Sequence, residues 1–156
     1  MAIDVHAFTT PRMWRIARRS RPEDLADALQ AAAADGADTL RLWRAPGVWL
    51  CVGDRAPEIA AKAAASTGAA TVDLSGAYVL WRIRGDWLGL LAHGSGLDPR
   101  DERFVARGVA WTRFVQFDVG VVRLSEDAGA VLGARSTSQD LDAALRRAAR
   151  HAEILG

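Results

Sequence analysis

Three side chains that could form a catalytic centre lie close together: His93, Ser95 and Asp98. Their types are those of a hydrolytic triad, in which a base oriented by a carboxylate activates a nucleophile. All three, however, lie where one short apolar segment ends at Gly94 and Gly96. Ser and Asp are common turn residues at such a point, and His is a common cation at a helix C-terminus. We therefore interpret them as turn and cap residues and predict no catalytic residue in this chain.

Two further side chains stand out from apolar strands. Asp73 is the one acid in the run before Ser75-Gly76, where it could be a buried functional carboxylate or the cap of that turn. We favour the cap, because Asp side chains commonly accept hydrogen bonds from the backbone two residues on. Cys51 is the only cysteine, so the chain holds no internal disulfide. Its apolar surroundings, Val48–Val52, indicate a small core residue in a reduced compartment.

No residue pattern indicates a metal or cofactor site in this chain. His6 and His151 lie near the two ends, and no set of His, Asp and Glu has metal-ligand spacing. The glycines of Gly94–Gly96 precede a polar loop, whereas a dinucleotide fingerprint needs a strand before them and a helix after them. We predict no cofactor-binding and no metal-binding residue.

Composition narrows the class of protein. The chain has 156 residues, half of them hydrophobic, a quarter charged, with a net charge of +1. This balance is that of a globular protein and supplies no electrostatic reason for nucleic acid or a membrane as partner. The N-terminal residues lack the apolar core of a secretory signal, and no run approaches the ~20 apolar residues of a membrane span. We expect a cytoplasmic protein.

The six tryptophans leave two interpretations open. Either all six belong to the core, or at least two lie on a surface that faces a partner, since Trp is enriched at interface hot spots.

The first half of the chain predicts an α+β unit. Residues 1–12 are expected to be a flexible lead-in. Apolar periodicity and turn residues then predict strand, helix, strand, strand, helix and strand over residues 13–74, which is the split βαβ (ferredoxin-like) order. The predicted elements are a strand at 13–17, a helix from Ser20-Arg-Pro22 to Asp35-Gly36, strands at 39–44 and 48–52, a helix at 56–65 and a strand at 70–74.

The second half, residues 75–156, predicts a related α+β unit that begins at the Leu74–Ala77 turn. Its order is strand, helix, strand, strand, strand, helix. The predicted elements are a strand at 78–84, a short helix capped by Asp86, one helical turn at 102–105, a strand at 109–117, strands at 119–124 and 130–135, and a last helix opened by a Ser136–Gln139 capping box. Asp142 and Arg146 are an expected i,i+4 ion pair on that helix. Residues 13–156 are thus expected to form one domain whose two halves share one body.

Three stretches of this sequence resemble the gamma subunit family of heterotetrameric sarcosine oxidase. They are the hairpin with Leu42-Trp43, Pro46 and Trp49-Leu50; the segment from Thr71 to Asp98; and Thr112-Arg113 with Arg135-Ser136. The resemblance covers roughly residues 40–150 in order. It implies a short relative of the folate-binding glycine-cleavage T-protein (aminomethyltransferase) fold. The sequence departs from the family pattern at Val48, Ser95-Gly96 and Asp86-Trp87.

The resemblance implies a noncatalytic gamma subunit of an amine oxidoreductase complex. Such a complex oxidatively demethylates sarcosine or a related secondary amine and yields formaldehyde or methylene-tetrahydrofolate. FAD, FMN, NAD, tetrahydrofolate and zinc would be held by the other subunits. The implied partners are the large alpha subunit, which binds folate and dinucleotide, and the beta and delta subunits. This chain looks too short to enclose a pterin.

Two rival hypotheses remain beside this one. The chain could be a free-standing split-βαβ module that binds a small molecule or assists assembly. It could also be an independent small enzyme that uses His93, Ser95 or Asp98.

Overall fold

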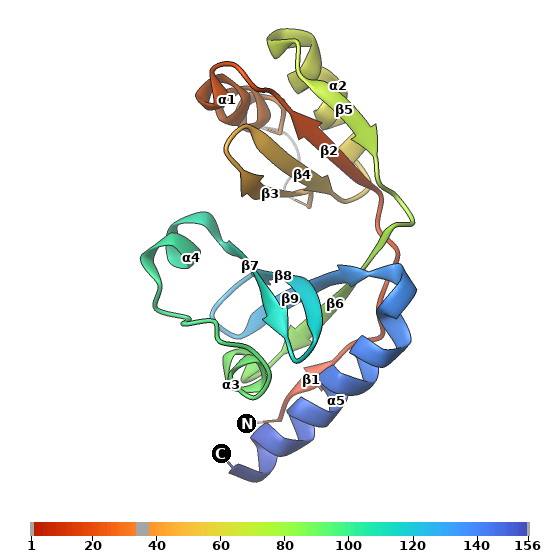
Figure 1. The fold of residues 1–156 in the computed structure, drawn as a ribbon, viewed down its shortest axis with the longest axis vertical. Coiled ribbons are helices and arrows are strands. Elements are labelled where there is room, and N and C mark those ends of the chain that lie inside the picture. Colours follow the sequence, from red (N-terminus) through yellow and green to blue (C-terminus); the bar gives the residue numbers. More distant parts are fainter. Residues whose placement is uncertain (1, 34–37, 156) are drawn as a thin grey trace. The chain divides into compact units, whose positions relative to one another are not determined.

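The chain forms two compact units in the computed structural model, which describes residues 2–33 and 38–155. The N-terminal unit is Pro11–Gly76, and the C-terminal unit combines Met1–Thr10 with Ala77–Gly156. Both units have antiparallel sheets with helices, so the α+β fold class predicted from the sequence is confirmed (Figure 1). That the two halves share one packed body stays a prediction.

The N-terminal unit is a split βαβ unit. Its sheet has the order β3-β4-β2-β5 and every neighbouring pair is antiparallel. The elements are β2 (Met13–Ala17), α1 (Pro22–Ala32), β3 (Leu40–Ala45), β4 (Val48–Val52), α2 (Ala56–Thr67) and β5 (Ala70–Asp73). The order of elements agrees with the prediction. Helix α1 begins at Pro22 with Arg21 at the cap position, which replaces the predicted Ser20 cap. The predicted end of this helix at Asp35-Gly36 lies outside the described residues.

Helices α1 and α2 pack on one apolar face of this sheet. Ile16 and Cys51 come from adjacent strands and contribute to the same buried cluster as Leu25 and Ile59 of the helices. All four side chains have no solvent exposure. Burial of one aliphatic side chain of this size contributes about 1.5–3 kcal/mol, so this cluster stabilises the unit.

The C-terminal unit is built on a five-stranded antiparallel sheet with the order β1-β6-β9-β8-β7. Strands β7, β8 and β9 form a meander whose last strand lies beside β6. The elements are β1 (Asp4–Val5), β6 (Tyr78–Arg84), α3 (Trp87–Ala92), α4 (Glu102–Arg107), β7 (Val109–Phe114), β8 (Phe117–Arg123), β9 (Ala128–Ala134), a 3₁₀ turn (Arg135–Thr137) and α5 (Ser138–Leu155).

Within residues 1–12, predicted as a flexible lead-in, three residues pair with β6. Asp4 and Val5 form β1, which pairs with Arg84 and Ile83 of β6. Thr9 and Leu80 exchange two backbone hydrogen bonds of 2.9 Å. Backbone pairing of this kind is independent of side-chain patterning, so a two-residue strand leaves no periodic signal in the sequence.

The predicted strand 109–117 is also divided in the structure. Strand β7 ends at Phe114, a two-residue turn follows, and β8 begins at Phe117. Val115 in this turn has a φ of 56°, a left-handed conformation that β-branched residues rarely adopt. At the last helix, the predicted Ser136–Gln139 box gives way to the 3₁₀ turn, so α5 begins at Ser138.

We expect Val115→Asn to stabilise the C-terminal unit by about 0.5–1 kcal/mol, because Asn tolerates the left-handed conformation better than Val. Val115 is 59% exposed, so the change removes little packing. Urea unfolding followed by circular dichroism measures the effect. Gln116→Asn, at the neighbouring turn position without a positive φ, is the control. A Val115→Asn variant less stable than wild type contradicts the prediction.

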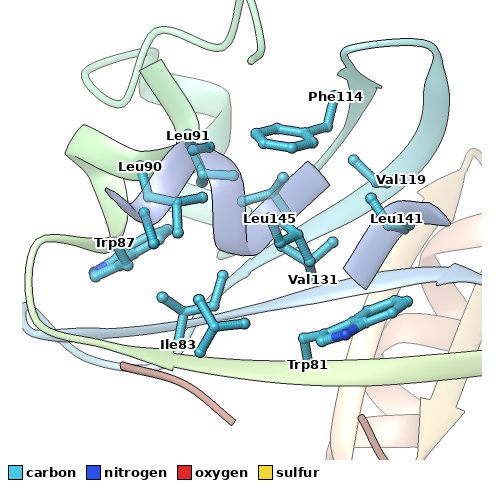
Figure 2. Close-up of a cluster of buried hydrophobic side chains, with 14 of the residues drawn as sticks. Trp81, Ile83, Trp87, Leu90, Leu91, Phe114, Val119, Val131, Leu141 and Leu145 are labelled. Carbon is cyan, nitrogen blue, oxygen red and sulfur yellow. The ribbon is translucent and has the colours of Figure 1, made fainter. Parts of the chain in front are cut away.

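The core of the C-terminal unit lies between the sheet and helices α3 and α5 (Figure 2). Trp81 and Ile83 lie two residues apart on β6, so both side chains face the same core. They share this core with Trp87 and Leu90 of α3 and Leu145 of α5. Glycines in β9 make room for the rings: a Cβ at Gly129 would lie 2.3 Å from Cε3 of Trp87. Aromatic residues and glycines are therefore matched across this core.

Candidate functional site

The structure gives His93, Ser95 and Asp98 separate local hydrogen bonds. Nδ1 of His93 lies 2.7 Å from the carbonyl oxygen of Gly89, to which it donates. Oγ of Ser95 accepts from the Leu97 amide at 3.4 Å. Oδ1 of Asp98 accepts from the Arg100 amide at 2.9 Å, and this bond, with a second from the Arg100 side chain, lowers the pKa of Asp98. Across residues 2–33 and 38–155, no hydrogen bond joins any two of the three.

Asp73 caps the turn that ends the N-terminal unit, as predicted. Its Oδ1 accepts from the Ser75 amide at 2.8 Å, while Oγ of Ser75 accepts from the Met13 amide at 2.9 Å. The side-chain and backbone hydrogen bonds from Ser75 lower the pKa of Asp73. The carboxylate is exposed, so the alternative of a buried functional acid does not apply.

Cys51 is a core residue of the N-terminal unit. Its side chain is fully buried between the sheet and the helices. Burial raises the pKa of the thiol to about 12, against a smaller opposing effect of Arg41. Because the thiolate is the nucleophilic form, this thiol is inert in the folded protein.

We expect Cys51 to resist alkylation by iodoacetamide in native buffer and to react at the rate of a free thiol in urea. Opening of the N-terminal unit must precede the reaction, since the side chain has no exposed surface. Quenched labelling followed by mass spectrometry of the intact chain measures the rate. A native rate equal to the rate in urea contradicts the buried position.

Metal and membrane sites are not apparent in the described part of the chain. Among residues 2–33 and 38–155, no three His, Cys, Asp or Glu side chains are grouped so that they could hold a metal ion. His6 is 47% exposed and lies 3.3 Å from Asp4. In the same residues, every helix is too short or too polar to cross a membrane.

A polar network joins α5 to two strands of the C-terminal unit. Asp142 accepts from Nε of Arg146 at 2.9 Å, which confirms the predicted i,i+4 pair. The same carboxylate accepts from the indole Nε1 of Trp81 at 2.9 Å. Nη1 of Arg146 donates to the carbonyl oxygen of Val5 at 3.0 Å. The network holds helix and strands together and contains no group poised to react.

Arg123 forms a second contact set that the sequence analysis missed. Its guanidinium lies 5.5 Å from the ring centroid of Trp87 and 5.1 Å from that of Phe104. Nη2 donates to the carbonyl oxygen of Pro99 at 3.2 Å. The signal in the sequence that could have pointed to this contact set is a single Arg at the end of an apolar strand. The cation ties α3, α4 and the intervening loop to β8.

The tryptophans divide into two groups. Trp81 and Trp87 are almost completely buried, while the other four are half-buried. Trp14 and Trp49 pack against the core of the N-terminal unit. The indole Nε1 of Trp14 is buried and has no hydrogen-bond partner within the described residues. Burial thus favours core roles for Trp81 and Trp87 and leaves a partner-facing role open for the half-buried residues.

The surface of the C-terminal unit includes the following two hollows, both lined by residues that the structure describes. One, of about 200 Å³, lies between β1 and α5 and includes Arg146 and Glu153 in its lining. The other, of about 400 Å³, is lined by His6, Ala7 and Thr9 and by Leu80, Arg82 and Arg84 of β6. Neither hollow could be predicted from the sequence, because each is lined by two segments far apart in the chain.

Comparisons with known proteins support the fold. No family model matches the chain, and no curated protein matches it. Among solved structures, the chain is similar to a chain of heterotetrameric sarcosine oxidase from Corynebacterium sp. U-96 in complex with pyrrole 2-carboxylate. The TM-score is 0.78 at 17% identity, over 96% of this chain and 84% of that chain.

Weaker similarity extends to aspartate kinase. The regulatory subunit of aspartate kinase from Thermus thermophilus, in its ligand-free form, matches with a TM-score of 0.53 at 16% identity, over 97% of this chain and 98% of that chain. A structure of aspartokinase alpha and beta subunits matches with a TM-score of 0.51 at 14% identity, over 95% of this chain and 97% of that chain. At these identities each likeness shows the fold alone. The fold of this chain is therefore shared with a subunit of sarcosine oxidase and, more distantly, with aspartate kinase chains.

Proposed function

We propose that this chain is a noncatalytic small subunit, of the gamma type, in a heterotetrameric flavoenzyme that oxidatively demethylates sarcosine or a related secondary amine. The observation that carries the proposal is the fold likeness to a chain of sarcosine oxidase, with a TM-score of 0.78 over 96% of this chain. The similarity covers elements of both units, so it is not limited to one common motif.

The local geometry of the candidate residues supports a noncatalytic role. His93, Ser95 and Asp98 are each engaged by neighbouring backbone groups, and the thiol of Cys51 is buried with a raised pKa. Under this proposal, FAD, FMN, NAD, tetrahydrofolate and zinc belong to the alpha, beta and delta subunits. The product is formaldehyde, or methylene-tetrahydrofolate when folate is present.

A native purification tests the proposal. The chain, carrying an affinity tag, is recovered from its own source cells, and the eluate is analysed by absorbance and by mass spectrometry. We expect larger chains in fixed stoichiometry, a flavin spectrum, and bleaching of the flavin when sarcosine is added without oxygen. A flavin-free monomer contradicts the proposal.

His93→Ala in the assembled complex is expected to leave amine oxidation unchanged, and a loss of activity would favour the independent-enzyme hypothesis.

The alternative is a free-standing module that binds a small molecule or assists assembly. The likeness in fold to a regulatory subunit of aspartate kinase favours it, with a TM-score of 0.53. The same purification separates the two proposals, because a free-standing module would be recovered without a flavoprotein.

A further inference from the structure

The larger hollow of the C-terminal unit has the size and lining of a small-ligand site. Its volume of about 400 Å³ lies within the range of ~300–1,000 Å³ typical of such sites. Leu80 and Ala7 supply apolar surface. Four side chains that can donate hydrogen bonds line the same hollow: His6, Thr9, Arg82 and Arg84.

A bulge in the strand pairing forms one wall of this hollow. The amide of His6 donates to the carbonyl oxygen of Arg82 at 3.0 Å, and Thr9 pairs with Leu80. Two residues therefore lie between His6 and Thr9, whereas one lies between Arg82 and Leu80. Such bulges commonly redirect side chains beside functional sites.

The two residues of the bulge, Ala7 and Phe8, face different surfaces. The ring of Phe8 packs edge-on against Trp81, with ring centroids 5.3 Å apart. Ala7 lines the hollow, and its single methyl group leaves the space open. The pairing thus keeps an apolar, unfilled position beside the two arginines of β6.

The arginines that line the hollow are exposed and available. Within residues 2–33 and 38–155, the guanidinium groups of Arg82 and Arg84 make no hydrogen bond and no ion pair. Their cross-strand neighbours on β9 are Ala130 and Ala128, whereas on β1 the neighbour of Arg84 is Asp4.

Two acids lie near Arg84. Asp4 is its cross-strand neighbour on β1, and a carboxylate oxygen of Asp4 lies 3.3 Å from Nε2 of His6. Asp127 accepts a hydrogen bond from Ser125, and this bond is the largest cause of its lowered pKa, while Arg84 makes a smaller contribution. Neither acid lines the hollow, whose lining carries two arginines and no carboxylate.

We propose that this hollow binds a small-molecule carboxylate with a short apolar body. Arg82 and Arg84 bind the carboxylate, since a planar guanidinium matches its two oxygens. The Thr9 hydroxyl supplies a further donor, and Leu80 and Ala7 contact the apolar body. This site does not depend on the proposed subunit function.

Titration of the isotopically labelled full chain with benzoate, followed by proton–nitrogen NMR at constant ionic strength, tests the site. We expect saturable shifts confined to the amides of residues 6–9 and 80–84. Benzamide, the neutral analogue, should bind at least about tenfold more weakly, because one charge-assisted hydrogen bond is worth roughly that factor. Inorganic phosphate should also bind more weakly, because it lacks the apolar body that contacts Leu80 and Ala7.

Matched variants complete the test. Arg82→Gln and Arg84→Gln should each weaken benzoate binding about five- to tenfold, whereas Arg103→Gln and Arg147→Gln, at exposed arginines of α4 and α5, should not change it. If a Gln variant fails to fold, the corresponding Lys variant, which lacks the planar fork, should still weaken binding. Absence of saturable shifts, equal binding of benzamide or phosphate, or equal effects of test and control variants would overturn the proposal.

Discussion

Trp87→Ala is expected to destabilise the C-terminal unit by about 3–5 kcal/mol, the range for truncating a buried aromatic side chain. Trp87 is 1% exposed, and its indole Nε1 donates to the carbonyl oxygen of Glu126 at 3.0 Å. Its ring also contacts Phe104, at a centroid distance of 6.4 Å, and the Arg123 guanidinium. Truncation leaves a cavity above Gly129 and removes all of these contacts at once.

Urea unfolding followed by far-UV circular dichroism measures this effect. Trp87→Phe should cost less than the Ala variant, because it keeps a ring beside Phe104 and loses the bond to Glu126. Val105→Ala is the control, since Val105 is 56% exposed and surface truncations usually stay within about 0.5 kcal/mol. Equal losses for Trp87→Ala and Val105→Ala would show that Trp87 is not part of the core.

The first and last residues of an element were predicted most accurately where turn residues flank it. Strand β4 has its predicted bounds, Val48–Val52, because Pro46-Gly47 precedes it and Gly53 follows it. The turn at Val115-Gln116 has none of the residues that mark turns, so the first predicted strand, 109–117, was extended past the end of β7 at Phe114 into β8. Tertiary pairing overrides local preference at that point.

Contacts between segments far apart in the sequence account for the remaining differences between the predicted and the observed structure. The Ile3 amide in the N-terminal segment donates to Oε1 of Glu153, 150 residues later, at 2.8 Å. The i,i+4 spacing identified Asp142 and Arg146, whereas Trp81, 61 residues from Asp142, could not be assigned to them. The hollow beside Arg82 was missed for the same reason, since the pairing of two distant segments creates it.

Asp142→Ala is expected to lower the free energy of unfolding by about 2–4 kcal/mol at neutral pH. The substitution leaves the indole N–H of Trp81 without an acceptor and removes the ion pair with Arg146. A hydrogen bond to a charged group is worth about 1.5–3 kcal/mol, and an unsatisfied buried donor costs about 1–3 kcal/mol. The Arg146 side chain is 42% exposed, so solvent screens its share. Asp140→Ala, at an exposed acid of the same helix, is the matched control.

The loss of stability caused by Asp142→Ala should depend on pH if the charge of Asp142 contributes to it. Burial alone would raise the pKa of Asp142, but hydrogen bonds from Arg146 and Trp81 and the charge of Arg146 outweigh it and lower the pKa. The folded-state pKa is thus below that of the unfolded chain, about 3.9. The stabilisation is therefore complete above about pH 4 and is lost as the pH falls through the folded-state pKa. The difference in unfolding free energy between wild type and Asp142→Ala should become smaller as the pH falls. Asp142→Asn keeps an acceptor for Trp81, so at neutral pH it should differ less from wild type than Asp142→Ala does. A gap that stays constant with pH would assign the network to packing instead of charge.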